Sequence, residues 1–340
     1  MNTLQVTVFG AGSIGCYVGG QLAHAGIDVR FIGRQRFQQA LRSRGLTLTH
    51  FDRKPIVVSP NAFSFDTELS DADVDVVLVC VKSQDTQQAG IALCTALRED
   101  TLVISLQNGA SNADVLRAAM PGFTVLAGMV PFNVTGTGPG AFHCGTQGDL
   151  CIEQHNDERL ATLRSGFERS GQGCLLSESI DAVLWGKLLV NLNNAMNTLF
   201  GGPLKAGLLQ RDYRRALSAM IEEALGIVRA AGIQPERFGG ASPDMMIRIL
   251  RLPNVIYRVV MNLVVKIDAN ARSSMLDDLE AGRPSEVDYL QGEIVRLAAS
   301  LQRSAPINST VLSLVEQAFV AGKSPRLMGA DIWRVIQSPN

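Results

Sequence analysis

A lysine and a row of polar residues on one predicted helix offer the first chemistry in this chain. Apolar spacing predicts a helix over 182–199. One stripe of that helix carries Lys187, Asn191, Asn194 and Thr198. A partly desolvated lysine has a lowered pKa and can donate a proton near neutral pH. The alternative is structural, since a lysine can lay its stem along apolar surface while asparagines bond across a helix interface.

A second polar segment contains an acid that suits either acid–base chemistry or helix capping. Ser274 has the spacing of a helix capping box with Asp277. Ser285 has the same spacing to Asp288. Glu286 would then lie in a first helical turn, where the helix dipole favours an acid. Helix propensity alone gives no reason to prefer a catalytic role to capping.

The start of the chain carries a glycine-rich motif that suits a dinucleotide. A short apolar run at 4–9 leads into G-x-G-x-x-G. Gly10 would make the tight turn, Gly12 would let the backbone approach a pyrophosphate, and Gly15 would let the next helix pack closely. That helix would aim its N–H groups at the phosphates. The candidate cofactor-binding residues of this loop are Gly10, Ala11, Gly12, Ser13, Ile14 and Gly15.

The residues after the glycine-rich loop complete a β-α-β unit and indicate the type of dinucleotide. Gly26 is placed to end the helix, and 28–32 predict a second strand. NAD-binding proteins usually carry an Asp or Glu at the end of this strand, whereas this chain has Gly33 and Arg34. A guanidinium there favours a 2′-phosphate and hence NADP(H), with Arg34 the better candidate and Arg36 the weaker one. The alternative for each is an ordinary solvated arginine.

Two apolar strands place further polar residues at one edge of a sheet. Strands are predicted over 75–81 and 102–106, with helices between the strands, and this alternation is typical of a doubly wound sheet. Lys82 and Asn108 follow directly after these two strands. Ligands of open α/β sheets bind at the carboxyl edge of the strands, so both residues are candidates for ligand binding.

The pattern of the remaining elements changes along the chain and divides it in two. Glycines punctuate short β-like runs over 131–153, which predict hairpin strands appended to the sheet. Past about residue 179 the segments predict helices, over 182–199, 212–231, 243–250, 256–269, 287–301 and 309–321. We therefore predict an α/β chain with an N-terminal Rossmann-type, doubly wound domain over 1–178. An all-helical domain is predicted over 179–340.

The composition of the chain argues against several function classes. The net charge is −1 over 340 residues with acids and bases interspersed, so we expect no nucleic-acid surface. Charged residues interrupt the apolar segment 255–267, which argues against a membrane span. The segment would either fill the core or form a homodimer interface. Six cysteines without a C-x-x-C pair predict free thiols, no metal site and a cytoplasmic location.

Taken together, the motifs resemble those of the ketopantoate reductase family, 2-dehydropantoate 2-reductase. In order they are G-x-G-x-x-G, V-K-S-x-x-T, Q-N-G, W-x-K-L-x-x-N and S-S-M-x-x-D-x-x-x-G-R-x-x-E-x-D-x-x-x-G, which run from Gly10 to Gly292. The resemblance implies a Rossmann domain followed by a helical domain, with the active site between them. It also implies that NADPH reduces 2-dehydropantoate to (R)-pantoate, on the route to pantothenate and coenzyme A.

The resemblance further implies a role for individual residues. Lys187 would be the general acid that protonates the ketone oxygen, and Glu286 would orient the substrate and contact the lysine. Asn191 would bind the substrate's hydroxyl, and Ser274 would bind its carboxylate. Asn108 would position the nicotinamide ribose and the substrate, and Lys82 would help to set the geometry near the cofactor.

One position departs from the family pattern and keeps alternatives open. The family usually has a second asparagine eight residues after the lysine, where this chain has Ala195. Asn194, one residue earlier, is a candidate substitute in substrate binding. The alternatives are a reductase of a different branched 2-keto acid and a non-catalytic NADP-binding sensor. A third is a related two-domain dehydrogenase that acts on a 3-hydroxy acid or a polyol phosphate.

Overall fold

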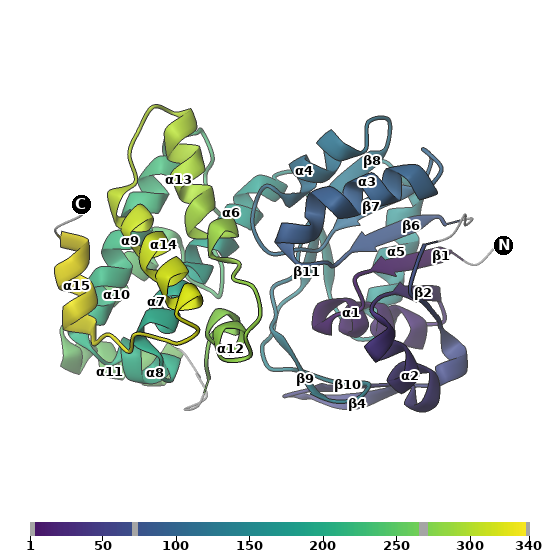
Figure 1. Ribbon diagram of the computed structural model, residues 1–340, viewed down its shortest axis with the longest axis horizontal. Coiled ribbons are helices and arrows are strands. Elements are labelled where there is room, and N and C mark those ends of the chain that lie inside the picture. The colour runs from purple at the N-terminus through teal and green to yellow at the C-terminus, as the bar shows by residue number, and fades with distance from the viewer. Residues whose placement is uncertain (1–3, 70–73, 265–270, 338–340) are drawn as a thin grey trace. The chain divides into compact units, whose positions relative to one another are not determined.

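The computed structural model describes residues 4–69, 74–264 and 271–337 of the chain. The chain divides into two compact units, Met1–Ile180 and Asp181–Asn340 (Figure 1). The first unit combines sheets with helices, and the described part of the second is built from helices. The fold is therefore the predicted one, a Rossmann-type sheet followed by a helical region.

The first unit is organised around an eight-stranded sheet. Its strand order is β12-β11-β8-β7-β6-β1-β2-β5, and every pair is parallel except β8 with β11. The strands are β1 (Gln5–Phe9), β2 (Asp28–Ile32), β5 (Ser64–Asp66), β6 (Val76–Val79), β7 (Leu102–Ser105), β8 (Thr124–Met129), β11 (Leu150–Glu153) and β12 (Cys174–Ser177). The chain leaves β1 for β2 on one side and reaches β6 on the other. Ligand sites of doubly wound sheets lie at such a switch point.

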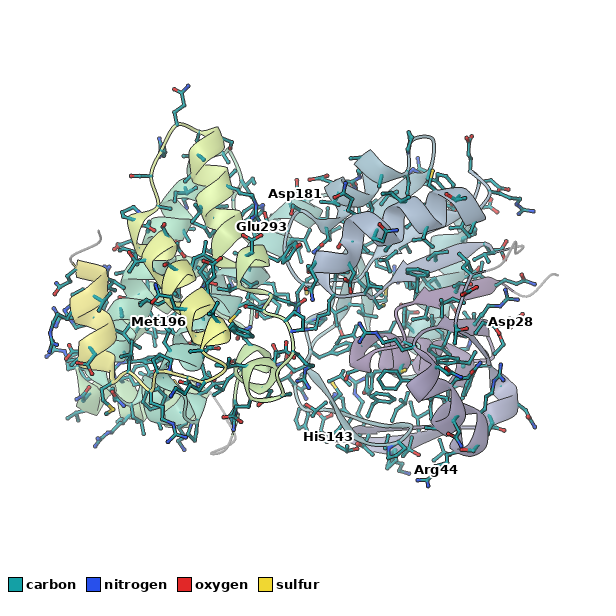
Figure 2. All side chains as sticks on the ribbon, viewed as in Figure 1. Asp28, Arg44, His143, Asp181, Met196 and Glu293 are labelled. Carbon is teal, nitrogen blue, oxygen red and sulfur yellow. The ribbon has the colours of Figure 1, made fainter. Side chains whose placement is uncertain are left out.

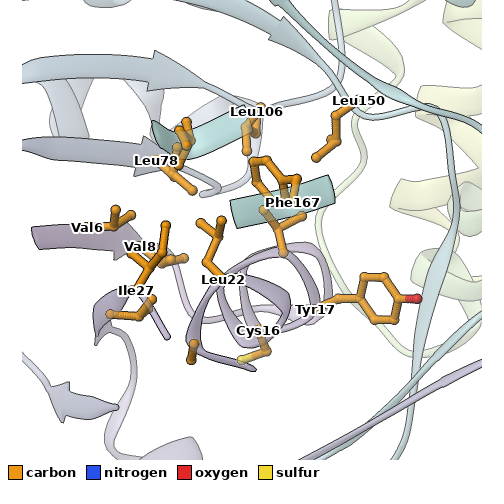
Figure 3. Packing of buried hydrophobic residues seen from close by; sticks show 14 of the residues in the cluster. Val6, Val8, Cys16, Tyr17, Leu22, Ile27, Leu78, Leu106, Leu150 and Phe167 are labelled. Carbon is orange, nitrogen blue, oxygen red and sulfur yellow. The ribbon is translucent and has the colours of Figure 1, made fainter. Parts of the chain in front are cut away.

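Helices cover both faces of this sheet and give it two apolar cores. The helices are α1 (Ser13–His24), α2 (Gln35–Arg44), α3 (Thr86–Ala96), α4 (Asn112–Ala119) and α5 (Glu158–Arg169), with short 3-10 turns η1 (Pro60–Ala62) and η2 (Ser83–Asp85). Alternate residues of β6 point to opposite faces. Leu78 packs in the cluster of α1 and α5 (Figure 3), whereas Val77 packs in the cluster that contains Leu93 of α3 and Leu116 of α4. Burial of each such side chain stabilises the sheet by about 1.5–3 kcal/mol.

The segment over 131–153 corrects the predicted topology. Only β11 joins the main sheet, while the hairpin before it belongs to a separate sheet of order β4-β3-β10-β9. The strands of this sheet are β3 (Leu46–His50), β4 (Arg53–Val58), β9 (Val134–Gly138) and β10 (Ala141–Cys144). The physical reason is the free edge of β3, to which β10 adds in parallel. Gly20 of α1 makes room for Leu46 and Leu48 of this second sheet.

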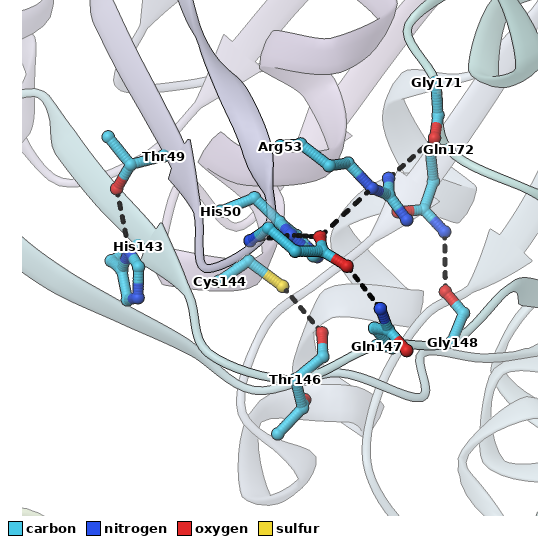
Figure 4. A network of polar contacts seen from close by, with 11 residues as sticks. Thr49, His50, Arg53, His143, Cys144, Thr146, Gln147, Gly148, Gly171 and Gln172 are labelled. Carbon is cyan, nitrogen blue, oxygen red and sulfur yellow. Dashed lines mark hydrogen bonds and ion pairs between the residues drawn. The ribbon is translucent and has the colours of Figure 1, made fainter. Parts of the chain in front are cut away.

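Polar contacts tie the second sheet to the rest of its unit (Figure 4). Arg53 of β4 donates from Nη1 to the carbonyl oxygen of Gly171 at 2.6 Å. Gln172 beside it donates to the carbonyl oxygen of Gly148 at 2.8 Å. These bonds fix the two loops that flank β11 and β12.

The second unit is helical throughout its described residues, apart from one isolated β-bridge. Its elements are α6 (Ile180–Asn191, which begins at the unit boundary), α7 (Asn193–Phe200), α8 (Leu204–Leu208), α9 (Arg211–Ala230), α10 (Pro243–Leu250), α11 (Asn254–Val264), α12 (Ser274–Glu280), η3 (Val287–Tyr289), α13 (Gln291–Ser300), α14 (Pro306–Val320) and α15 (Gly329–Gln337). The long helix α9 packs against α10, α13, α14 and α15. Met196 of α7 is fully buried inside this unit (Figure 2). Across the described ranges, none of the helices has both the length and the apolarity that crossing a membrane requires.

Three predicted helices differ from those in the structure. The helix over 182–199 is two helices, because α6 ends at Asn191 and α7 starts at Asn193. The segment 287–301 begins as the 3-10 turn η3, and α13 starts only at Gln291. Of the predicted helix 256–269, α11 covers the part up to Val264, and residues 265–270 lie outside the described residues.

Candidate functional site

The glycine-rich loop between β1 and α1 has little room for side chains at two of its glycines. Gly10 adopts φ +111°, in the region that favours glycine, and a Cβ there would lie 2.6 Å from the Val81 nitrogen. A Cβ on Gly15 would lie 2.9 Å from Val8 Cγ1 and closer still to the Gly10 carbonyl oxygen. Gly12 is different, since no atom lies within 4 Å of the place of a Cβ. The loop thus offers open space at the glycine expected to face a pyrophosphate.

The N-terminus of α1 fits an anionic group. Gly12 is its N-cap, no side chain caps the helix, and the first turn contains no acid. Ser13 and Ile14 are half-buried, while Ala11 is buried and donates its N–H to the Ile32 carbonyl oxygen at 3.0 Å. The first N–H groups of a helix lack partners within the helix and attract anions. The residues present therefore fit a dinucleotide's phosphates.

Arg34, the residue predicted to hold a 2′-phosphate, has an accessible side chain. It is exposed, follows Gly33 after β2, and is the N-cap of α2. A Cβ on Gly33 would lie 2.5 Å from Ala11 Cβ, so the backbone beside Arg34 touches the glycine-rich loop. Arg36 lies in α2, and its side chain is outside the described residues.

One acid near this position, Asp66, was not predicted from the sequence. Asp66 ends β5 and is in register with Ile32 of β2. Its carboxylate lies 3.8 Å from Arg30 and 3.9 Å from Arg42, which offset its negative charge. Only the pairing of β2 with β5 could have revealed it.

Lys82 and Asn108 lie after neighbouring strands, as the order of the sheet requires. Strands β6 and β7 pair in parallel with Val79 opposite Ser105, so both loops emerge at the same edge. Both side chains are half-buried. The backbone carbonyl oxygen of Asn108 accepts a hydrogen bond from Ser83 Oγ at 2.9 Å. The two loops are therefore joined directly.

In the helical unit, the polar stripe of the predicted helix is interrupted. Lys187 and Asn191 belong to α6 and Asn194 to α7, and all three are half-buried. Thr198 does not share their surface, because it is fully buried and donates to the Asn194 carbonyl oxygen at 2.9 Å. Ala195 is also fully buried. Its position thus faces the core in this chain, and Asn194 is the more accessible of the two.

Lys187 has the altered acidity that its surroundings predict. Burial lowers its pKa to about 8, while the carboxylate of Glu286 acts in the opposite direction. Desolvation disfavours the charged ammonium, and a nearby negative charge favours it. Glu286 is half-buried and directly precedes η3. The structure therefore couples this lysine to this acid, and a lysine with such a pKa can donate a proton near neutrality.

The capping predictions for the two serine motifs are wrong in detail. Ser273, not Ser274, caps α12, and its Oγ accepts from the Leu276 N–H at 3.2 Å. Ser274 is exposed at the first position of that helix, where its hydroxyl is accessible. Ser285 Oγ accepts from the N–H of Val287 at 3.1 Å, two residues onward. The carboxylate of Glu286 is consequently not required for either cap.

Two buried amides that the sequence analysis missed hold these segments together. Asn197 Oδ1 accepts from the Ser273 N–H at 2.9 Å, which ties the start of α12 to α7. Gln291 Nε2 donates to the Leu192 carbonyl oxygen at 3.0 Å, at the break between α6 and α7. Both amide side chains are fully buried. Their only sequence signal is a polar residue at an apolar position of a helix.

The described residues show no metal centre of the usual kind. Within 4–69, 74–264 and 271–337, no group of three His, Cys, Asp or Glu side chains is arranged to hold a metal ion. The first unit carries a candidate dinucleotide site, and the second carries a candidate acid–base pair.

Comparison with known proteins gives matches along most of the chain. Residues 6–157 match the family described as ketopantoate reductase PanE/ApbA, and residues 179–318 match its C-terminal counterpart. A 2-dehydropantoate 2-reductase of Halobacterium salinarum is 29% identical, over 93% of this chain and 99% of that protein. The crystal structure of a PanE/ApbA family ketopantoate reductase from Ralstonia eutropha JMP134 is 30% identical, with a TM-score of 0.79 over 94% of this chain and 99% of that one. A D-mandelate dehydrogenase, 18% identical over 94% of this chain and 99% of its own, shares the fold with a TM-score of 0.77.

Proposed function

Because the chain belongs to the ketopantoate reductase family, we propose that it reduces 2-dehydropantoate to (R)-pantoate with NADPH, with Lys187 as the general acid. The family makes the chain an oxidoreductase acting on CH–OH groups and supports a nicotinamide cofactor. The observation that carries the proposal is Lys187, whose pKa burial lowers to about 8 beside the Glu286 carboxylate. The product would serve pantothenate and coenzyme A synthesis.

The proposed reaction needs a positive group at the ketone oxygen. When bound, a reduced nicotinamide supplies a hydride to the carbonyl carbon, and negative charge develops on the oxygen. The Lys187 ammonium stabilises that charge and donates its proton to the oxygen. With a pKa of about 8, roughly nine in ten of these side chains carry the proton at pH 7. The Glu286 carboxylate favours the charged form of Lys187 and thereby keeps this proton donor protonated.

Accessible polar groups in the same unit as Lys187 support a role in holding the keto acid. We propose that Asn191 binds the substrate's hydroxyl and Ser274 its carboxylate, while Glu286 orients it. Ser274 is exposed and Asn191 is half-buried, so neither is committed to the core. Asn194 takes the place of the family's second asparagine, since Ala195 is fully buried.

The first unit supports the choice of NADP(H). We propose that domain 1–178 binds the cofactor and that domain 179–340 binds the substrate. The glycine-rich loop would hold the pyrophosphate, and Arg34 would pair with the 2′-phosphate, because the exposed guanidinium follows β2 where NAD-binding proteins usually have an acid. Lys82 and Asn108 would hold the nicotinamide end at the carboxyl edge of β6 and β7.

The experiment is a turnover assay that follows NADPH absorbance with 2-dehydropantoate as substrate. Lys187→Ala should abolish turnover yet keep NADPH binding, whereas Lys205→Ala, at an exposed lysine of the same unit, should change neither. Turnover only with another branched 2-keto acid would replace the proposed substrate. Binding of NADPH without turnover of any 2-keto acid would favour a sensor, and turnover unaffected by Lys187→Ala would refute the assigned acid.

The exposed face of α11 supports a homodimer. Val255 is 76% exposed and Val259 is 56% exposed, so these residues do not fill the core, although Tyr257 between them is buried. We propose that a second copy of the chain covers this face. Sedimentation velocity should show a dimer that Val259→Asp dissociates, and a monomeric native protein would refute the proposal. A cytoplasmic location stays a prediction.

A further inference from the structure

The sequence motifs after β6 and β7 contain polar residues to which the proposed function assigns no role. V-K-S-x-x-T contributes Ser83 and Thr86 besides the lysine, and Q-N-G contributes Gln107 besides the asparagine. Each of these three side chains is buried, with at most 6% of its surface exposed. Buried polar groups normally satisfy their hydrogen bonds inside the protein, so these residues need partners there.

The partners are one another, together with Asn112 at the start of α4. Thr86 Oγ1 accepts from Gln107 Nε2 at 2.7 Å and lies 2.8 Å from both Asn112 Oδ1 and the Ser83 carbonyl oxygen. Asn112 Nδ2 donates to Ser83 Oγ at 3.2 Å. We call Ser83, Thr86, Gln107 and Asn112 the polar cluster. It spans the first residue of α3, the first residue of α4 and the loops after β6 and β7.

The polar cluster also donates hydrogen bonds to backbone carbonyl oxygens at the candidate ligand-binding residues. Ser83 Oγ donates to the Asn108 carbonyl oxygen at 2.9 Å, and Asn112 Nδ2 donates to the same oxygen. Gln107 Nε2 donates to the Val81 carbonyl oxygen at 3.1 Å, directly before Lys82. The backbones that carry Asn108 and Lys82 are therefore fixed relative to each other by side chains that are themselves buried.

We propose that the members of the polar cluster are positioning residues, which set the relative placement of Lys82 and Asn108 for the dinucleotide. The inference rests on the proposed function, in which those two residues hold the nicotinamide end. Thr86 is the central member, since its hydroxyl contacts the other three. Without that hydroxyl, a Gln107 N–H and the Asn112 Oδ1 lose their partner in a buried site, and the two loops must rearrange.

The test compares two threonine-to-valine changes on the same helix. Thr86→Val removes the central hydroxyl with little change in volume, and Thr86→Ser retains the hydroxyl. Thr95→Val is the matched control, because Thr95 is exposed on α3 and its Oγ1 donates to the Ile91 carbonyl oxygen of its own helix at 3.0 Å. The readouts are the NADPH dissociation constant from fluorescence titration, kcat and KM with 2-dehydropantoate, and the thermal midpoint of each variant.

A positioning role predicts a specific combination of results. Thr86→Val should weaken NADPH binding and lower kcat/KM by on the order of tenfold to a hundredfold at a temperature where it is fully folded. Thr86→Ser should recover most of the loss, and Thr95→Val should stay within about twofold of the native protein. The alkaline limb of the pH profile should not move, because burial and Glu286, which set the pKa of Lys187, are not part of the polar cluster.

The remaining outcomes separate this inference from the proposed function. A Thr86→Val variant that melts several degrees lower but binds NADPH normally would reduce the polar cluster to a structural role and overturn the proposal. If Thr86→Val does not fold, Ser83→Ala decides, since it removes the hydroxyl that donates to the Asn108 carbonyl oxygen and accepts from Asn112 Nδ2; normal NADPH binding by this variant would overturn the proposal. A native protein that binds NADPH without reducing 2-dehydropantoate would refute the substrate and leave the inference standing. A native protein that binds no dinucleotide would overturn both.

Discussion

Replacing Glu286 by glutamine isolates the electrostatic part of its proposed role. The substitution keeps the size of the side chain and removes its negative charge. In the native protein burial lowers the pKa of Lys187 to about 8, and the Glu286 carboxylate raises it against that tendency. Removing the carboxylate must therefore lower the lysine's pKa further. An opposite charge within a few ångströms typically changes a pKa by one unit or more, which is about 1.4 kcal/mol.

The expected magnitude follows from the fraction of protonated lysine. The general acid works in its protonated form, so activity falls as the pH rises through its pKa. With a pKa of about 8, about half of the native lysines are protonated at pH 8. A pKa one unit lower leaves about one in eleven protonated, which is an approximately fivefold loss. At pH 6 Lys187 is almost fully protonated in both proteins, so its ionisation contributes almost nothing to the difference in their activities.

The assay is kcat/KM with 2-dehydropantoate between pH 6 and pH 9.5, since this parameter reports groups of the free enzyme. The alkaline limb of Glu286→Gln should lie about one pH unit below that of the native protein. Glu316→Gln, at an exposed acid on α14, should leave the limb in place. Loss of substrate orientation alone would lower the curve equally at every pH. A limb that stays in place, or moves to higher pH, would refute the coupling between Lys187 and Glu286.

The other predictions concern the cofactor loop and the buried amide of the helical unit. Arg34→Ala should raise the KM for NADPH by about tenfold to a hundredfold, because it removes charge-assisted bonds that contribute about 1.5–3 kcal/mol. The KM for NADH should not change. Steady-state kinetics with both cofactors tests this, and an equal loss with NADH would contradict the 2′-phosphate role. Gly15→Ala should lower the thermal midpoint and weaken NADPH binding, because its methyl would lie 2.9 Å from Val8 Cγ1. Gly226→Ala, where nothing lies within 4 Å, should instead stabilise by about 0.5–1 kcal/mol. Asn197→Ala should lower the free energy of unfolding in urea by about 2–4 kcal/mol, since the buried Ser273 N–H and the part-buried Gly202 carbonyl oxygen lose their partner. A change below about 0.5 kcal/mol would show that these bonds contribute little.

The parallel sheet could be predicted because its information is local. Apolar runs such as 102–106 are long enough to mark buried strands, and the glycines of the first loop mark a backbone that excludes side chains. The order of elements then places Lys82 and Asn108 at one edge. The second sheet could not be predicted in this way, because β10 pairs with β3 across about ninety residues, and no local pattern encodes which edge a strand selects.

In the helical unit, the sequence predicted which candidate residues share a helix but not where that helix ends. The spacing of Lys187 and Asn191 follows from a single helix, and both do lie on α6. Thr198 was assigned to the same stripe, yet α7 turns it into the core. The break after Asn191 coincides with the bond from Gln291 to the Leu192 carbonyl. That contact joins residues 99 positions apart, so helical periodicity contains no sign of it.

In both units, buried side-chain amides that donate to backbone carbonyl oxygens fix the positions of the candidate residues. In the first unit Gln107 donates to the Val81 carbonyl oxygen beside Lys82, and Asn112 donates to the carbonyl oxygen of Asn108 itself. In the second unit Gln291 donates to the Leu192 carbonyl oxygen beside Asn191. A carbonyl just beyond the end of a strand or helix lacks a partner in that element, and a buried amide that supplies one fixes where the chain turns. The fixed turn then determines where the next polar side chain lies. Residue types predict the chemistry of such candidate residues, whereas buried amides, which include Gln107 and Gln291 from distant segments, determine their geometry.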